Sequence, residues 1–136
     1  LAPGRSLGTA VALPELDWHA QGVPHYAWLL EATDAATVLA GGHAIPVRLP
    51  DAGRFFWHKL YSSAARSSVP AKAAKDLLQA ATLAAVIAEQ GETTLGRSLR
   101  DAPAALVSAA RRRLPALLRL LGAHPQAAEQ ASEALR

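Results

Sequence analysis

The chain has 136 residues, of which 51% are hydrophobic and 18% charged, and this is enough apolar content for the core of one domain. Cysteine is absent, which excludes disulfides and thiolate metal sites. No stretch reaches the roughly 18 uninterrupted apolar residues of a membrane span and no signal peptide is evident, so we expect a cytoplasmic protein without membrane contact.

The first part of the chain predicts a few extended segments. Residues 1–23 are rich in proline and glycine and predict coil with one strand, and residues 25–32 predict a short helix. The apolar runs 36–39 and 44–49 flank Gly41-Gly42. Because glycine reaches positive φ without strain, these two runs predict a β-hairpin.

Helices follow from Asp51, which is a good N-cap for a helix that runs to about Arg66. A second helix over residues 71–90 ends at Gly91, as a C-terminal glycine predicts. A short link rich in serine joins the two, so we expect antiparallel neighbours.

The remaining sequence predicts further helices. Thr93 or Thr94 can cap a short helix through Leu99, and Asp101 with Pro103 starts a longer one. We expect Pro115 to kink or divide that helix, Gly122 to end it, and residues 125–135 to form a last helix.

These elements together predict an α+β fold that is predominantly helical. A short β-hairpin or edge sheet near residues 36–49 would precede a bundle of about four to five helices. We expect residues 1–50 to be a strand-containing segment and residues 51–136 to be a helical domain.

Two basic clusters on the first two long helices are the strongest sign of a site, because all three lysines of the chain lie there. Lys59 and Arg66 are seven residues apart, which is about two helical turns, so they lie on the same helix face. The compact charge of a lysine ammonium suits the binding of phosphate. Alternatively, these are solvated cationic faces, or a lysine pairs with Asp76 and ties two helices together. The candidate residues are Arg54, His58, Lys59, Arg66, Lys72, Lys75, Asp76 and Gln79.

A third basic cluster, Arg111-Arg112-Arg113, lies in the later part of the chain. From Arg97 onward the sequence contains seven arginines and only three acidic residues. Contiguous arginines fan out around a helix, so some face solvent. A nucleic-acid backbone or an acidic partner could bind there, or the run could simply be a solvated surface.

Carboxylates offer one further candidate. On an extended strand Glu15 and Asp17 would face the same side and could bind a divalent cation, or they could be surface loop carboxylates. The sequence has no methionine and begins at Leu1, so we expect it to be a piece of a longer protein.

Two motifs carry a family resemblance: His58-Lys59-Leu60, and one helix later Lys75-Asp76. With the Gly41-Gly42 turn before them, they resemble the downstream, C-terminal half of a bacterial family of nucleotidyltransferase-like proteins over roughly residues 11–90. That family belongs to the polymerase-beta-type nucleotidyltransferase superfamily and has a distant likeness to abortive-infection toxin nucleotidyltransferases.

The resemblance implies transfer of a nucleoside monophosphate from a nucleoside triphosphate to an unknown acceptor. In that superfamily acidic residues on a small sheet hold Mg²⁺. We expect those acids upstream of Leu1, in a missing N-terminal catalytic half. We therefore expect Mg²⁺ and a nucleoside triphosphate to be bound by the full-length protein, and the present chain to be inactive alone.

Three functions stay open at this stage. The chain could be the substrate-contacting part of a nucleotidyltransferase, with Arg54, Lys59, Arg66, Lys72 and Lys75 on phosphates, Asp76 orienting a lysine and Gln79 donating hydrogen bonds. It could instead be a nucleic-acid or protein-binding helical module that uses Arg111–Arg113. A structural or oligomerisation domain is the third possibility. In each case we expect the chain to self-associate through exposed apolar surface where a missing part would dock.

Overall fold

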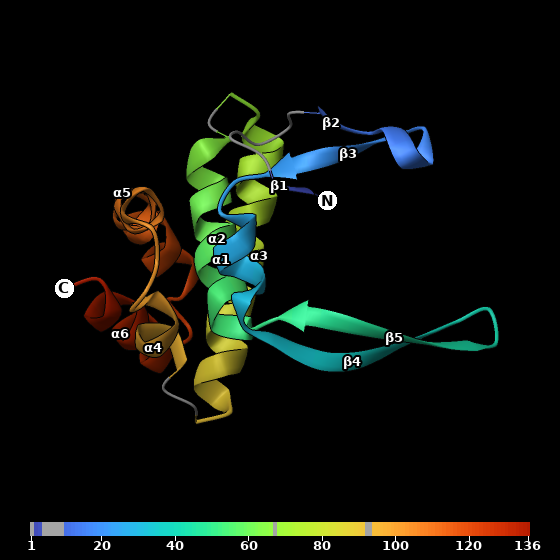
Figure 1. Cartoon of the computed structure of the whole chain (residues 1–136). Coiled ribbons are helices and arrows are strands. Elements are labelled where there is room, and N and C mark those ends of the chain that lie inside the picture. Colours follow the sequence, from blue (N-terminus) through green and yellow to red (C-terminus); the bar gives the residue numbers. More distant parts are fainter. Residues whose placement is uncertain (1, 4–9, 67, 92–93) are drawn as a thin grey trace.

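The computed structural model describes residues 2–3, 10–66, 68–91 and 94–136. Helices α2 and α3 form the centre, with α4, α5 and α6 on one side and α1 with the strands on the other (Figure 1). In chain order the elements are β1 (Ala2–Pro3), β2 (Ala10–Leu13), η1 (Pro14–Leu16), β3 (Trp18–Val23), α1 (Tyr26–Glu31), β4 (Thr33–Ala40), β5 (His43–Pro50), α2 (Ala52–Ala65), α3 (Pro70–Glu89), α4 (Thr94–Leu99), α5 (Ala104–Leu120) and α6 (Pro125–Ala134).

The first sheet has three strands in the order β1-β3-β2. Strand β2 pairs with β3 antiparallel, from Ala10 opposite Gln21 to Leu13 opposite Trp18, and β1 pairs with β3 parallel. The prediction of coil with one strand was therefore incomplete. The sequence of β3 is poor in β-branched residues, and its hydrogen bonds come from pairing with segments that no local pattern identifies.

The connection between β2 and β3 corrects the paired-carboxylate prediction. Glu15 lies in the 3₁₀ turn η1, and Asp17 ends it in a left-handed conformation with φ of 47°. The two residues are therefore not alternate positions of a strand, because Pro14 starts a turn rather than continuing the extended chain.

The second sheet is the hairpin β4–β5, as predicted, although it extends over residues 33–50. Ala40 pairs with His43 across Gly41 and Gly42, whose φ angles are 55° and 78°. Two residues with positive φ form the tight turn that suits the twist of paired strands. The hairpin projects away from the helices (Figure 1), and it leaves Leu39 80% exposed.

The start of α2 is fixed by Asp51, as predicted. Its Oδ1 accepts a hydrogen bond from the Arg54 backbone N–H at 2.8 Å and a second from Ser98 Oγ of α4 at 2.9 Å. A Cβ on Gly53 would lie 2.3 Å from Ser98 Oγ. Glycine at this position therefore allows α4 to approach the first turn of α2.

The core lies where α2 meets α3, α5 and α4. Phe56, Trp57 and Leu60 are fully buried there, and Trp57 Nε1 donates a hydrogen bond to the Leu95 carbonyl of α4 at 2.8 Å. Helix α3 contributes a face of small residues that lets its neighbours pack closely. Its buried alanines are Ala73, Ala80, Ala81, Ala84, Ala85 and Ala88.

The later helices follow the prediction with one difference. Helix α5 begins after Pro103 and passes through Pro115 as one helix, so Pro115 does not divide it, and a kink there stays a prediction. Pro115 is exposed to solvent. Leu106, before it, and Leu117, after it, are both buried in the same core, so both parts of the helix pack against that core. The helix ends at Leu120, before Gly122. The predicted cap at Thr93 lies outside the described residues, as does the Thr94 side chain.

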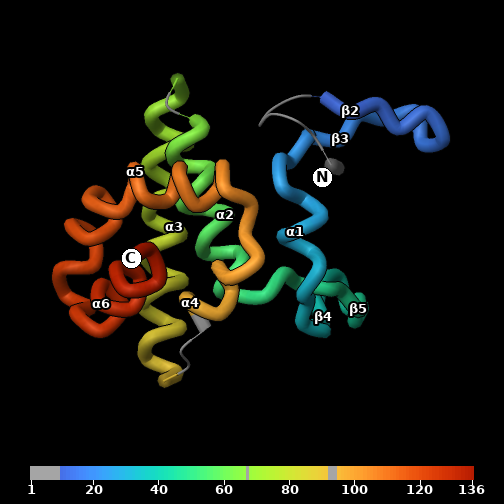
Figure 2. The backbone as a smooth tube through the Cα atoms, turned by 60° about the vertical axis from the view of Figure 1, so that its left-hand side comes forward, coloured from blue at the N-terminus to red at the C-terminus, as the bar shows by residue number. Residues whose placement is uncertain are grey.

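The arrangement confirms a predominantly helical α+β fold. In Figure 2, α2 and α3 lie in the middle, with α5 and α6 on one side of them and α1 on the opposite side. Within the described ranges, none of the helices combines the length and apolar character needed to cross a membrane. The division into two domains at residue 50 stays a prediction.

Replacing Trp57 by Phe should lower the free energy of unfolding by about 2 kcal/mol, because the Leu95 carbonyl loses its donor and the core loses volume. Urea unfolding followed by circular dichroism measures the change. Trp18→Phe is the matched control, since Trp18 is 62% exposed and should tolerate the same substitution. Equal effects of the two substitutions would contradict this account of the core.

Candidate functional site

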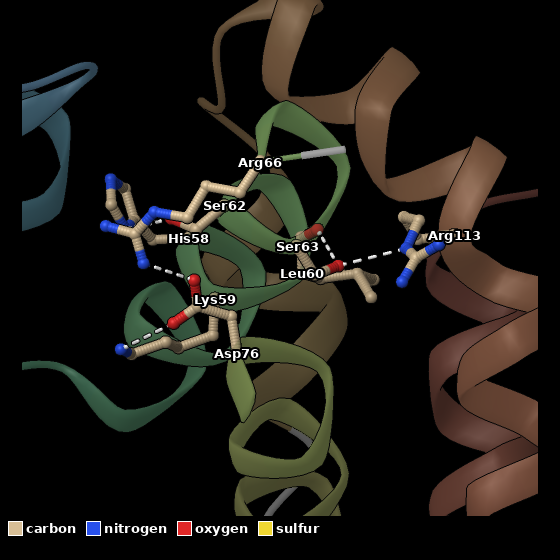
Figure 3. A network of polar contacts seen from close by, with 8 residues as sticks. All are labelled: His58, Lys59, Leu60, Ser62, Ser63, Arg66, Asp76 and Arg113. Atoms are coloured by element: carbon tan, nitrogen blue, oxygen red, sulfur yellow. Dashed lines mark hydrogen bonds and ion pairs between the residues drawn. The ribbon is translucent and has the colours of Figure 1, made fainter. Parts of the chain in front are cut away.

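A buried carboxylate links two cations between α2 and α3 (Figure 3). Asp76 of α3 is 3% exposed; Lys59 Nζ lies 3.1 Å from its Oδ1, and Arg66 Nη1 lies 2.5 Å from its Oδ2. Lys59 and Arg66 are seven residues apart on α2 and therefore share a face. The three groups, named here the basic network, carry one net positive charge.

A small cavity borders the basic network. It has a volume of about 120 Å³ and lies between β3, α1 and α2. Lys59 and Arg66 supply its cationic wall, and the Lys59 ammonium also lies 5.2 Å from the centre of the Phe55 ring. The full lining is Gln21, Val23, Leu29, Phe55, His58, Lys59, Ser62 and Arg66.

His58 lines the same cavity but is occupied by structural hydrogen bonds. Its Nε2 lies 2.9 Å from the Pro24 carbonyl oxygen, which can only accept, so Nε2 carries the proton. Its Nδ1 accepts a long hydrogen bond of 3.5 Å from Ser62 Oγ. Burial lowers the pKa of His58 below 6.5, so the ring is neutral at pH 7 and ties α2 to the end of β3.

Arg54 lies outside the basic network. Its Nη1 contacts the Trp28 carbonyl oxygen and lies 2.8 Å from Glu31 Oε2, and its guanidinium lies 5.2 Å from the centre of the Trp28 ring. The prediction grouped Arg54 with Lys59 and Arg66. The structure instead uses Arg54 to hold α1 against α2.

Three more predicted residues do not join the basic network. Lys72 and Lys75 are exposed and form no ion pair with a described residue. Gln79 is half-buried, and its Oε1 has no hydrogen-bond partner among the described residues. Solvated lysines on α3 are expected because burial of an unpaired ammonium is costly. The binding roles of these residues stay predictions.

The arginine run on α5 divides between two places: Arg111 reaches the end of α6, whereas Arg112 and Arg113 lie beside α2 and α3. Arg111 Nε donates to the Leu135 carbonyl at the end of α6 at 3.2 Å, and Arg113 Nε donates to Ser63 Oγ of α2 at 3.1 Å. Arg112 is exposed. Successive helical residues point in different directions, so the run does not form a single patch.

Sequence reasoning missed Ser63 and Pro24, which hold Arg113 and His58 in place, and it did not identify Ser62 as a partner of His58. A serine inside an apolar helix carries no local sign of a partner fifty residues away. Among the described residues, no three His, Asp or Glu side chains come together to hold a metal ion. A metal ion held by three such protein groups therefore has no site among the described residues.

Asp76→Asn should lower the free energy of unfolding by about 2 kcal/mol, because Lys59 and Arg66 would lose their shared counter-ion while partly buried. Thermal or urea unfolding measures the loss. Asp34→Asn is the control with the same chemistry at an exposed position. A loss no larger than that of the control would show that Asp76 does not hold the helices together.

Stability should fall as the pH is lowered below 6.5. Burial lowers the pKa of His58 in the folded state, so the unfolded chain binds the proton first. The stability contribution is complete above pH 6.5 and is lost as the pH falls through the lowered pKa. His58→Gln should flatten this dependence in urea unfolding between pH 7.5 and 5, whereas the exposed control His19→Gln should retain it.

The comparisons with known proteins confirm the nucleotidyltransferase part of the resemblance. A family model described as nucleotidyltransferase matches residues 2–104, from β1 to the first residue of α5. That range contains the basic network and excludes the arginine run. No curated protein and no solved structure matches the chain. The match spans more than half of the chain, which therefore belongs to this nucleotidyltransferase family.

Proposed function

We propose that this chain is the helical, substrate-contacting part of a nucleotidyltransferase that moves a nucleoside monophosphate from a nucleoside triphosphate to an acceptor. Lys59 and Arg66 bind phosphate groups of the substrate in this proposal. The observation that carries it is the pairing of both cations with one buried carboxylate beside an open cavity.

The two cations retain donors for a ligand. A lysine ammonium has three N–H donors and a guanidinium has five, and each group uses one of them on Asp76. The carboxylate thus orients both groups while one positive charge stays uncompensated. Hydrogen bonds from a charged donor to a phosphate oxygen contribute about 1.5–3 kcal/mol each.

The cavity limits which part of a nucleotide can enter. Its volume is about 120 Å³, and its cationic wall of Lys59 and Arg66 suits a phosphoryl group rather than a sugar or a base. We therefore place a phosphate in the cavity and the sugar and base outside it.

Transfer of a nucleotidyl group requires more than phosphate binding. Mg²⁺ would bridge the phosphates and neutralise developing charge. No three His, Asp or Glu side chains come together among the described residues, and we assign no metal-dependent step to them. We propose that the carboxylates for Mg²⁺ belong to another part of the full-length protein, and that the chain by itself binds substrate without catalysing transfer.

Lys59→Gln should weaken binding of ATP about tenfold or more, because a charge-assisted phosphate contact is lost. Titration of a fluorescent ATP analogue, with unlabelled ATP and GTP as competitors, measures the affinity. Arg66→Gln should act in the same direction. Lys75 lies outside the cavity and has no phosphate contact in this proposal, so Lys75→Gln removes the same charge from an exposed position and should bind like the wild type.

Melting temperatures of the three variants separate lost binding from lost folding. Two results would overturn the proposal: a wild-type chain that binds neither nucleotide at millimolar concentration, or an equal loss in the Lys75→Gln variant.

A further inference from the structure

A second basic cavity lies on the side of α2 away from the basic network. Its volume is about 400 Å³, and it opens between α2, the first turns of α3 and the middle of α5. Figure 3 shows Arg113 on the opposite side of α2 from Lys59 and Arg66. The residues that line this cavity, named here the arginine cavity, are Ser63, Ala64, Pro70, Ala73, Ala74, Leu77, Arg112 and Arg113.

The Arg113 guanidinium is held in position by a buried hydroxyl. Ser63, which is 1% exposed, donates from Oγ to the Leu60 carbonyl at 2.8 Å and accepts from Arg113 Nε at 3.1 Å. The hydroxyl is neutral, so this contact does not compensate the positive charge of Arg113. Only one of its five N–H donors is used within the described part of the chain, and four remain for a ligand.

Arg112 adds a second guanidinium to the same cavity. It is exposed and forms no hydrogen bond or ion pair with any residue that the structure describes. The lining residues include no Asp or Glu to compensate the two charges. The first turn of α3 adds positive potential from its helix dipole.

We propose that the arginine cavity binds phosphate groups of a nucleic-acid backbone. Planar guanidinium groups match phosphate oxygens in a bidentate geometry, and two neighbouring arginines suit successive phosphates of one strand. The other lining residues are alanine, proline, serine and a buried leucine, so the cavity lacks the exposed aromatic anchors typical of protein interfaces. It also lacks a stacking platform for bases, which indicates binding without base specificity.

The arginine cavity uses neither Lys59 nor Arg66, so this inference is independent of the proposed nucleotide site. The arginine cavity is formed by α2, α3 and residues beyond position 104. It therefore lies partly outside the range that matches the family model. If both sites are occupied, α2 separates the nucleotide from the nucleic acid.

Fluorescence anisotropy with a labelled 16-nucleotide single-stranded RNA, and with DNA of the same sequence, tests the proposal on the full chain. We expect binding that weakens steeply between 50 and 200 mM salt. Arg112→Ala should weaken it about fivefold, and Arg112→Ala with Arg113→Ala should lower the salt slope by about 1.5, since two phosphate contacts are lost.

The controls separate this site from other sources of charge. Arg119→Ala removes an exposed arginine of the same helix outside the cavity and should change the affinity little. Lys59→Gln should leave RNA affinity unchanged, and Arg112→Ala should leave ATP affinity unchanged. Arg112→Ala removes a side chain without described contacts, so it tests the site even if loss of Arg113 disturbs folding.

Three results would overturn the inference. The first is absence of RNA and DNA binding at 50 mM salt, and the second is an equal loss in the Arg119→Ala variant. The third is tighter binding of a labelled poly-glutamate peptide of equal charge than of RNA, which would assign the cavity to an acidic protein partner.

Discussion

The burial of α2 on every side is the constraint on which the structure depends. From Gly53 to Ala64 no residue of this helix is exposed, although the segment contains an arginine, a histidine, a lysine and two serines. A buried polar group without a partner is costly, so each of these side chains must find one. The contacts of α2 therefore determine where α1, β3, α3 and α5 can lie.

Four polar residues of α2 reach four different neighbouring elements. Arg54 holds α1, His58 holds the end of β3, Lys59 pairs with α3, and Ser63 accepts from Arg113 of α5. Apolar contacts alone would allow these elements to slide, because dispersion and hydrophobic burial have little directionality. The hydrogen bonds fix one register, and His58, Lys59 and Ser63 also line the two basic cavities.

Local signals made much of this fold predictable. Asp51, the Gly41-Gly42 pair and Gly91 act within four residues of their own positions, and the helix and hairpin boundaries they predicted were close to those observed. The three-stranded sheet was not predictable in the same way. Its β1–β3 pairing joins Ala2 to Gly22, and no periodicity within either segment reports such a contact.

The candidate site was predictable only in part, for the same reason. Spacing on one helix placed Lys59 and Arg66 together, and the alternative in which a lysine ties two helices through Asp76 describes the observed contact. Spacing could not show that Arg54 would turn to α1 or that Arg111 and Arg113 would diverge. Those outcomes depend on which acceptors the packing brings near, namely the Trp28 carbonyl, the Leu135 carbonyl and Ser63.

A structural ion pair and a phosphate site are compatible in the basic network because one carboxylate faces two cations. A one-to-one pair would leave no net charge, and a ligand would have to displace the carboxylate. Here Asp76 offsets the repulsion between Lys59 and Arg66 and keeps both heads at the cavity wall. In the function proposed above, an entering phosphate would meet groups already in position, and less side-chain entropy would be lost on binding. The interaction that joins α2 to α3 would thus also prepare the proposed phosphate site.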